Sequence, residues 1–269
     1  MRQESQPARS LSDKMISGSL SLWHRAVEPM RLKTARDSLR SKTATDTRVS
    51  VLIPTHNRVD LLLERALPSV LAQTHTDMDI HIVQHGCWYS IEWPQDERIL
   101  VHHIERDVHY PDNPWNRWYA GPVDPLNHAL SLATGAYIAR IDDDDTWEPD
   151  HLEKCLRFMD KFPTMEFVSA GHATHDNDHV DPYLFPGNNV IGGTQTWVYR
   201  SYLKMFKYNR NCWRNASNRV NDTDLQYRMY RAGVRMGYLN EVHAHVLPRP
   251  GETEIGLKAY VNIGRKEGS

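Results

Sequence analysis

The stretch AYIARIDDDD, residues 136–145, joins a strand-like run to four consecutive aspartates. Its first six residues are short, largely apolar and typical of a strand buried on both faces of a parallel sheet. The carboxylates of Asp142, Asp143, Asp144 and Asp145 repel one another, and burial raises that cost. A cation normally neutralises such a cluster, and hard divalent ions such as Mg²⁺ or Mn²⁺ prefer oxygen ligands. The stretch therefore predicts a cation-binding strand end rather than an acidic turn in solvent.

Strands and helices alternate around this stretch. Expected strands lie at residues 49–53, 80–83 and 99–104, and expected helices lie at residues 61–71, 125–134 and 149–159. This alternation predicts an α/β fold with a doubly wound, parallel sheet. Ligands bind such sheets at the carboxyl ends of the strands. Residues 54–58, which follow the first strand, are therefore expected at the same edge as the aspartates.

The chain beyond residue 160 is less regular. Strands are expected at residues 167–170 and 194–199, and an edge strand at residues 242–247. A helix is expected over residues 222–232, because acidic side chains occupy its first turn and Gly233 follows its last residue.

Composition restricts the class of protein. Of 269 residues, 40% are hydrophobic and 25% are charged, which is typical of a globular domain. The net charge of −2 gives no indication of a nucleic-acid partner. The three distant cysteines fit reduced thiols, and no apolar run reaches the length of a membrane span. We expect a cytoplasmic protein with no secretory signal.

The two ends of the chain differ from its middle. Residues 1–47 are rich in Ser and basic side chains, with a helix expected over residues 20–39. This N-terminal extension is interpreted as a flexible or loosely docked tail; the alternative is a basic amphipathic helix in peripheral contact with an anionic membrane surface. The main domain is predicted at residues 48–250, followed by a C-terminal tail at residues 251–269.

Three ordered motifs resemble those of family 2 glycosyltransferases. Residues 49–58 and 66–73 are similar to the family's opening, and residues 126–147 to the segment that carries its DXD motif. Residues 221–225, with Arg228 and Gly233, resemble the acidic segment of its general base. The resemblance extends from residue 49 to residue 246. It implies the GT-A fold, a Rossmann-like, mostly parallel sheet flanked by helices.

The resemblance also implies an activity. A metal-dependent enzyme would transfer a sugar from a nucleotide-diphosphate sugar to a hydroxyl of a glycan or small acceptor, with inversion, in glycan, polysaccharide or glycoconjugate synthesis. The cofactor would be Mn²⁺ or Mg²⁺. One alternative is a nucleotidyltransferase, which would require a glycine-rich phosphate loop that residues 54–60 lack. The other is a non-catalytic nucleotide-sugar-binding module of the same fold.

Site roles follow from the resemblance. Asp144 would bind the metal, and Asp142 and Asp143 would lie near the ribose or a metal-bound water, with Asp142 also a candidate ligand. His243 and His245 alternate along an expected strand, and His245 is the preferred histidine ligand. The nucleotide pocket would be lined by Pro54, Thr55, Asn57 and Arg58.

The implied general base is Asp222, which would remove the acceptor hydroxyl proton. The alternative role for Asp222 is a helix N-cap carboxylate, and Asp224 is the fallback base. Asn221 precedes it where the family commonly has an acid.

The chain departs from the family pattern after its second expected strand. It has Gln84-His85-Gly86-Cys87 where the family usually carries an acidic pair followed by Gly-Ser. Gln84 is expected to contact the nucleotide base, since an amide both donates and accepts hydrogen bonds. UDP, GDP and dTDP therefore all remain candidates for the donor nucleotide.

Overall fold

A computed structural model describes residues 8–39, 46–89, 91–105, 110–185, 189–215 and 219–256. Residues 1–7 and 40–45 of the expected N-terminal extension, and residues 257–269 of the expected C-terminal tail, lie outside these ranges.

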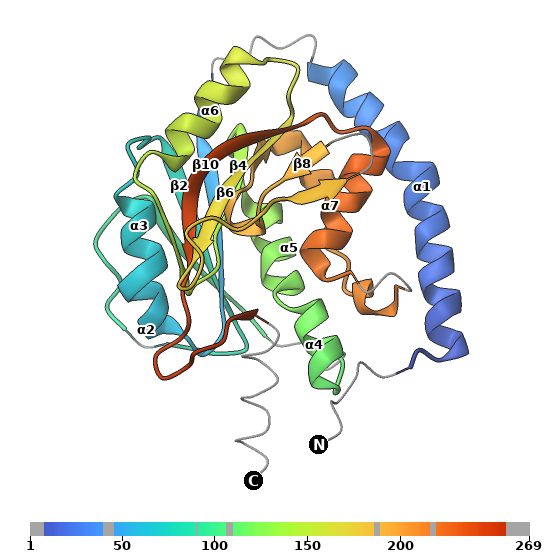
Figure 1. The fold of residues 1–269 in the computed structure, drawn as a ribbon, viewed down its shortest axis with the longest axis horizontal. Coiled ribbons are helices and arrows are strands. Elements are labelled where there is room, and N and C mark those ends of the chain that lie inside the picture. The colour runs from blue at the N-terminus through green and yellow to red at the C-terminus, as the bar shows by residue number, and fades with distance from the viewer. Residues whose placement is uncertain are drawn as a thin grey trace.

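Within the described residues, one eight-stranded sheet has the order β3-β2-β1-β4-β9-β6-β10-β5 (Figure 1). Its strands are β1 (Val49–Thr55), β2 (Met78–His85), β3 (Ile99–Ile104), β4 (Tyr137–Arg140), β5 (Asp145–Trp147), β6 (Phe167–Thr174), β9 (Val198–Arg200) and β10 (Met236–Val246). β1 is parallel to β2 and β4, β2 is parallel to β3, and β6 is parallel to β10. β9 runs antiparallel to β4 and β6, and β5 runs antiparallel to β10. The predicted mostly parallel α/β sheet is confirmed.

Helices cover both faces of the sheet (Figure 1). They are α1 (Leu11–Leu39), α2 (Val59–Leu61), α3 (Leu67–Leu71), α4 (Pro114–Ala120), α5 (Val123–Leu132), α6 (His151–Lys161) and α7 (Asn221–Ala232). A π-helical turn, Leu62–Ala66, joins α2 to α3, so the helix expected at residues 61–71 is present with an altered middle turn. Short 3₁₀ segments lie at Thr194–Thr196, Ser201–Met205 and Cys212–Arg214, and β7 (Tyr183–Phe185) pairs with β8 (Asn189–Ile191) as a hairpin.

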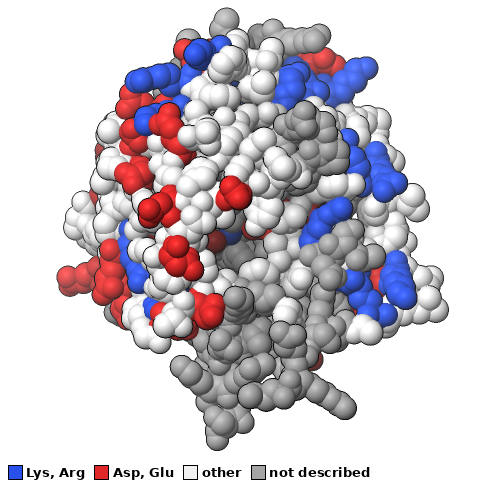
Figure 2. Space-filling model, viewed as in Figure 1, with Lys and Arg blue, Asp and Glu red and all other residues white. Residues whose placement is uncertain are grey.

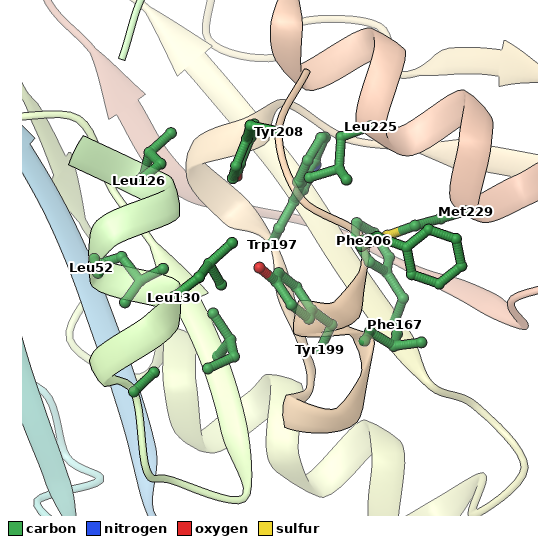
Figure 3. Close-up of a cluster of buried hydrophobic side chains, with 14 of the residues drawn as sticks. Leu52, Leu126, Leu130, Phe167, Trp197, Tyr199, Phe206, Tyr208, Leu225 and Met229 are labelled. Atoms are coloured by element: carbon green, nitrogen blue, oxygen red, sulfur yellow. The ribbon is translucent and has the colours of Figure 1, made fainter. Parts of the chain in front are cut away.

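Two buried apolar clusters hold these layers together. One lies between α3, α6 and the sheet, and includes Leu67 and Leu152. The other lies on the opposite face, where Leu130 of α5 and Leu225 of α7 pack with Trp197 (Figure 3). Burial of such side chains is worth roughly 1.5–3 kcal/mol each. The aromatic side chains of this second cluster fill the space between the sheet and α7.

Two expected strands differ from their predictions. The strand expected at residues 242–247 is part of the longer β10, which lies between β6 and β5 and is not an edge strand. The edge is β5, formed by the last aspartate of the acidic run and the two residues after it, and its pairing with Ala244 to Val246 covers the side of β10. Residues 194–196 form a 3₁₀ turn, which leaves three residues for β9.

Helix α1 begins nine residues before the helix expected from the sequence and lies along α7 (Figure 1). Buried Arg228 of α7 pairs with Glu28 of α1 and with Asp224 of its own helix. Further along α1, Arg36 donates to Glu166 over 2.6 Å. The N-terminal segment is thus joined to the domain through charged side chains. Among the described residues, no helix combines the length and apolarity needed to cross a membrane.

Candidate active site

Strands β1 and β2 position the first polar residues of the site. Thr55, the last residue of β1, pairs with Gln84 of β2, and both side chains are buried. The chain then turns at Asn57, whose φ of 53° lies in the left-handed region that Asn tolerates better than most residues. Arg58 follows and caps α2. Because β1 is parallel to β4, this loop lies beside the aspartates that follow β4.

Arg58 contacts two of these aspartates. Its Nη2 lies 2.8 Å from Oδ1 of Asp143, and its Nη1 lies 2.6 Å from Oδ2 of Asp144. Asp143 is fully buried, and this burial raises the pKa of its carboxyl to about 7, while the charge of Arg58 acts in the opposite direction. The structure thus brings together the loop after β1 and the acidic run.

Arg140, the last residue of β4, links the acidic run to α7. Its buried guanidinium donates to Asp142 over 2.6 Å and to the Thr194 hydroxyl over 3.0 Å. Burial lowers the pKa of Arg140, but the charges of Asp142, Tyr208 and Asp222 raise it, and the net shift is upward. Asp222 at the start of α7 is therefore electrostatically part of the same site as Asp142.

Asp144 is also contacted from the C-terminal part of the chain. Arg249 Nε lies 3.3 Å from its Oδ2, and Arg65 Nη1 lies 3.3 Å from its main-chain oxygen. The next residue, Asp145, is buried. This burial, and to a smaller extent the negative charges of Asp144, Asp142 and Asp143, raise the pKa of its carboxyl well above the usual range. Guanidinium groups therefore neutralise much of the negative charge of the aspartates, for which the sequence predicts a bound cation.

The donor set suits a hard divalent ion, because Asp142 and Asp144 offer carboxylate oxygens with side-chain exposures of 30% and 18%. Within the described ranges, however, no three His, Cys, Asp or Glu side chains converge as a metal site. His245 is not gathered with Asp144; its Nε2 lies 2.6 Å from Glu148 Oε1. His243 is buried near Asp150, at 3.5 Å.

The two acids of α7 have different surroundings. Val220 is the N-cap residue and makes no side-chain cap, so Asp222 is not the N-cap carboxylate that the sequence allowed. Burial raises the pKa of Asp222, whereas Arg140 and the hydrogen bond from the Thr223 amide lower it, and the net shift is upward. Asp224 is buried and lies 2.9 Å from Arg228 Nε, which makes it part of the helix contact with α1. Of the two acids, Asp224 is held in an ion pair, whereas the Asp222 carboxylate accepts hydrogen bonds from Thr223.

The residues expected to line the nucleotide pocket lie at the carboxyl ends of β1 and β2. Pro54 and Thr55 are buried in β1, and Gln84 Oε1 accepts the main-chain N–H of Tyr89 over 3.0 Å. Tyr89 also reaches back, with its hydroxyl 3.5 Å from Asn57 Oδ1. Gln84 therefore shapes the loop after β2 through an uncharged amide.

Three arginines of this site were missed by sequence reasoning. Arg140 had a local signal, because it lies two residues before Asp142 on an expected strand. Arg65 and Arg249 had no local signal in the sequence. Both lie far from Asp144 along the chain, and only the tertiary fold brings them to it.

A family model described as "Glycosyl transferase family 2" matches residues 50–231. WcaA of Escherichia coli K12, whose name assigns it to colanic acid biosynthesis, is 31% identical over 173 residues, which are 56% of this chain and 57% of WcaA. TuaG of Bacillus subtilis 168, named for teichuronic acid biosynthesis, is 31% identical over 137 residues, 51% of this chain and 52% of TuaG. An uncharacterized glycosyltransferase of Rickettsia conorii is 31% identical over 161 residues, and 24% of its length is covered. The matched part of the chain thus spans about half of WcaA and TuaG, and less of the Rickettsia protein.

Solved structures agree with this assignment at the level of the fold. Staphylococcus aureus TarS 1-349 in complex with UDP-GlcNAc has a TM-score of 0.57 and 16% identity, covering 79% of this chain and 61% of that chain. The Pyrobaculum calidifontis mannosyltransferase PcManGT, in complex with GDP-Man and Mn²⁺, has a TM-score of 0.50 and 15% identity, covering 96% and 77%. The parallel sheet, the acidic run after β4 and the family match over residues 50–231 together show that this chain belongs to glycosyl transferase family 2, with the GT-A fold.

Proposed function

We propose that this chain transfers a sugar from a nucleotide-diphosphate sugar to a hydroxyl of a glycan or small acceptor, with inversion. The observation that carries the proposal is the single charged network formed by Arg58, the aspartates after β4, Arg140 and Asp222. The network provides cations for a diphosphate at one end and a carboxylate for proton removal at the other. The catalytic domain is proposed as residues 48–250.

Proton removal is assigned to Asp222. A carboxylate whose pKa is raised by burial is a stronger base than one in water, and this suits abstraction from a hydroxyl. Arg140 donates a hydrogen bond to Asp142, and its charge also lowers the pKa of Asp222, so it limits the repulsion between the two carboxylates. An inverting reaction requires one general base and one leaving group. Asp222 is the carboxylate that we assign as this base.

A divalent ion, Mn²⁺ or Mg²⁺, is proposed as the cofactor, held by Asp144 and Asp142, with His245 as a further candidate. When bound, it would stabilise the negative charge of the departing nucleoside diphosphate. Arg58 and Arg249 now pair with Asp144, and both carry planar donor groups that match phosphate oxygens. We propose that they bind the diphosphate when the donor is present. PcManGT, a relative by fold, was solved with Mn²⁺.

We propose that the loop after β2 contacts the nucleobase of the donor nucleotide. Gln84 can pair with a base through its amide, yet it lacks the charge of the acid expected there. The solved relatives hold UDP-GlcNAc and GDP-Man, so UDP and GDP donors are proposed first and dTDP next. The names of WcaA and TuaG favour polysaccharide synthesis, and a cytoplasmic location is proposed.

The proposal is tested with Asp222→Asn. We expect binding of the donor nucleotide to stay within about twofold of the parent, and sugar transfer to fall by roughly 10²- to 10⁴-fold, because a base contributes on that order. Calorimetric titration with UDP, GDP and dTDP measures binding, and a screen of nucleotide sugars for metal-stimulated release of the nucleoside diphosphate identifies the donor.

Asp160→Asn, at an exposed position of α6, is the matched control and should behave as the parent. Transfer at the parental rate by Asp222→Asn would overturn the base assignment. Binding of a nucleotide sugar without any sugar release by the parent would favour a binding module, and release of pyrophosphate in place of a nucleoside diphosphate would favour a nucleotidyltransferase.

A further inference from the structure

The face of helix α1 that packs on the domain carries charged side chains beside apolar ones such as the fully buried Leu32. The face against the domain carries Asp13, His24 and Glu28, which are half-buried or buried, and Asp13 and Glu28 pair with Arg214 and Arg228. A helix that packs on a domain usually buries an apolar stripe and exposes its polar side. Helix α1 differs in that its docked face mixes ion pairs with apolar residues, and further large apolar side chains stay exposed.

The opposite face of α1 exposes an apolar stripe to solvent. Leu11, Met15 and Leu22 share one side of the helix at 3.6 residues per turn, and Trp23 and Met30 lie next to them. Leu11, Met15, Leu22 and Met30 are each more than 60% exposed, and Trp23 is 48% exposed. Large apolar side chains scattered singly are normal, but a contiguous row along one helix marks a contact surface.

Basic side chains flank this stripe. Lys14, Arg25, Arg31 and Lys33 are all exposed, and the Arg31 guanidinium lies 5.4 Å from the centre of the Trp23 ring. Figure 2 shows Lys and Arg along the side of the molecule where α1 lies, and Asp and Glu mainly on the other side. Of the acidic residues in α1, Asp13 and Glu28 are engaged on the docked face.

We propose that this exposed face of α1 binds the surface of an anionic lipid membrane, with the apolar stripe in the headgroup region and the flanking cations on lipid phosphates. Basic residues beside Leu and Trp on one helix face are the pattern of an interfacial helix. A lipid surface fits better than a second copy of the chain. A two-fold dimer places the same patch against itself, so the cations of one copy would lie against the equally basic patch of the other. This inference does not depend on the proposed sugar transfer.

Because α1 is docked in this way, its exposed apolar face can contact a membrane without any rearrangement of the domain. The ion pairs of Glu28 and Arg36 fix α1 to α7 and to the strand start at Glu166, so the apolar face points away from the fold. The N-terminal end of α1 reaches the 3₁₀ turn at Cys212–Arg214, just before α7. Membrane contact through α1 would hold the whole domain, including Asp222, at a set distance from the surface.

The test is flotation of the full chain with vesicles of phosphatidylcholine, with and without phosphatidylglycerol. The parent should float with the anionic vesicles and stay behind with the neutral ones. Each Lys or Arg near an anionic surface adds about 1 kcal/mol, so Arg25→Gln with Lys33→Gln should weaken binding roughly 20- to 30-fold. Leu22→Ser with Trp23→Ser should weaken it about tenfold or more through lost apolar burial.

Matched controls come from α6. Arg157→Gln with Lys161→Gln removes two exposed charges elsewhere, and Phe162→Ser removes an exposed aromatic ring, and neither should change flotation. Unchanged circular dichroism and melting temperature of the α1 variants would show that they fold, because the substituted side chains point away from the domain. Equal binding to neutral and anionic vesicles, no binding by the parent, or parental binding by the α1 variants would each overturn the proposal. A dimer in sedimentation that Trp23→Ser dissociates would show instead that the face binds a second copy.

Discussion

At the scale of single residues, the site is a balance between aspartates and arginines. Arg58 and Arg249 both contact Asp144, and Arg140 contacts Asp142. Two of these arginines come from β4 and from the loop after β1, whereas Arg249 follows β10. Under the proposed function, a divalent ion would take the place of these guanidinium groups at Asp144 while the guanidinium groups bind the diphosphate.

Asp144→Asn tests this exchange. We expect addition of Mn²⁺ to raise the affinity of the parent for a nucleoside diphosphate, and to leave the affinity of the variant unchanged, because an amide is a poor ligand in place of a carboxylate. Titration calorimetry with and without Mn²⁺ measures both. Asp160→Asn serves as the control, and an equal response to Mn²⁺ in Asp144→Asn would show that the ion is held elsewhere.

At the scale of elements, the contact between α1 and α7 depends on one buried cation. Arg228 contacts Glu28 and Asp224, and all three residues are at most 5% exposed. Burial of charges is costly, and the arrangement is favourable only while each charge has its partner. Arg228 therefore links α1 to α7 through one buried charged network, beside the separate ion pairs that Arg36 and Asp13 form with the domain.

Arg228→Met should lower the free energy of unfolding by roughly 3–5 kcal/mol, because two buried carboxylates lose their partner. Arg157→Met is the matched control: Arg157 forms the same i, i+4 pair with Glu153 on an exposed helix surface, and such pairs contribute roughly 0.3–0.5 kcal/mol. Urea denaturation of the two variants measures the difference. Similar losses in both would mean that Glu28 and Asp224 find other partners.

At the scale of the whole molecule, acid sensitivity follows from buried histidines. Burial, and then the neighbouring charge of His243, lowers the pKa of His151 to about 3, from an unfolded value near 6.5. Burial lowers the pKa of His24 to about 4, with Arg228 next. The unfolded chain binds protons at these positions before the folded chain does. These two histidines therefore contribute their full stabilisation above pH 6.5, and this contribution falls as the pH decreases below 6.5.

His151→Gln isolates one such group. The difference in free energy of unfolding between parent and variant should shrink by about 2 kcal/mol when the pH falls from about 7.5 to about 5, since the parent alone pays for keeping this imidazole neutral. Urea denaturation at several pH values gives the two curves. Parallel curves for parent and variant would show that His151 is protonated in the folded protein.

Much of the fold and part of the site could be predicted without coordinates. A short apolar run such as residues 49–53 predicts its strand because a strand that is buried on both faces needs consecutive apolar side chains. Residues 145–147 were missed as a strand, because their acidic and aromatic residues carry no such pattern and pairing with β10 alone makes them extended. Gly233, with φ of 90°, ends α7 as its position predicted.

The sequence by itself determined the α/β class, the place of the acidic run at a strand end, and the helix that carries Asp222, because hydrophobic periodicity and helix stop signals are local properties of the chain. Only the tertiary structure decided which groups meet there. Arg249 lies at Asp144, His245 lies at Glu148, and Asp224 is taken by Arg228. Such long-range charge pairs depend on strand order and on the docking of α1, and neither leaves a local pattern. The aspartate run therefore belongs to a network of arginines that the linear sequence does not display.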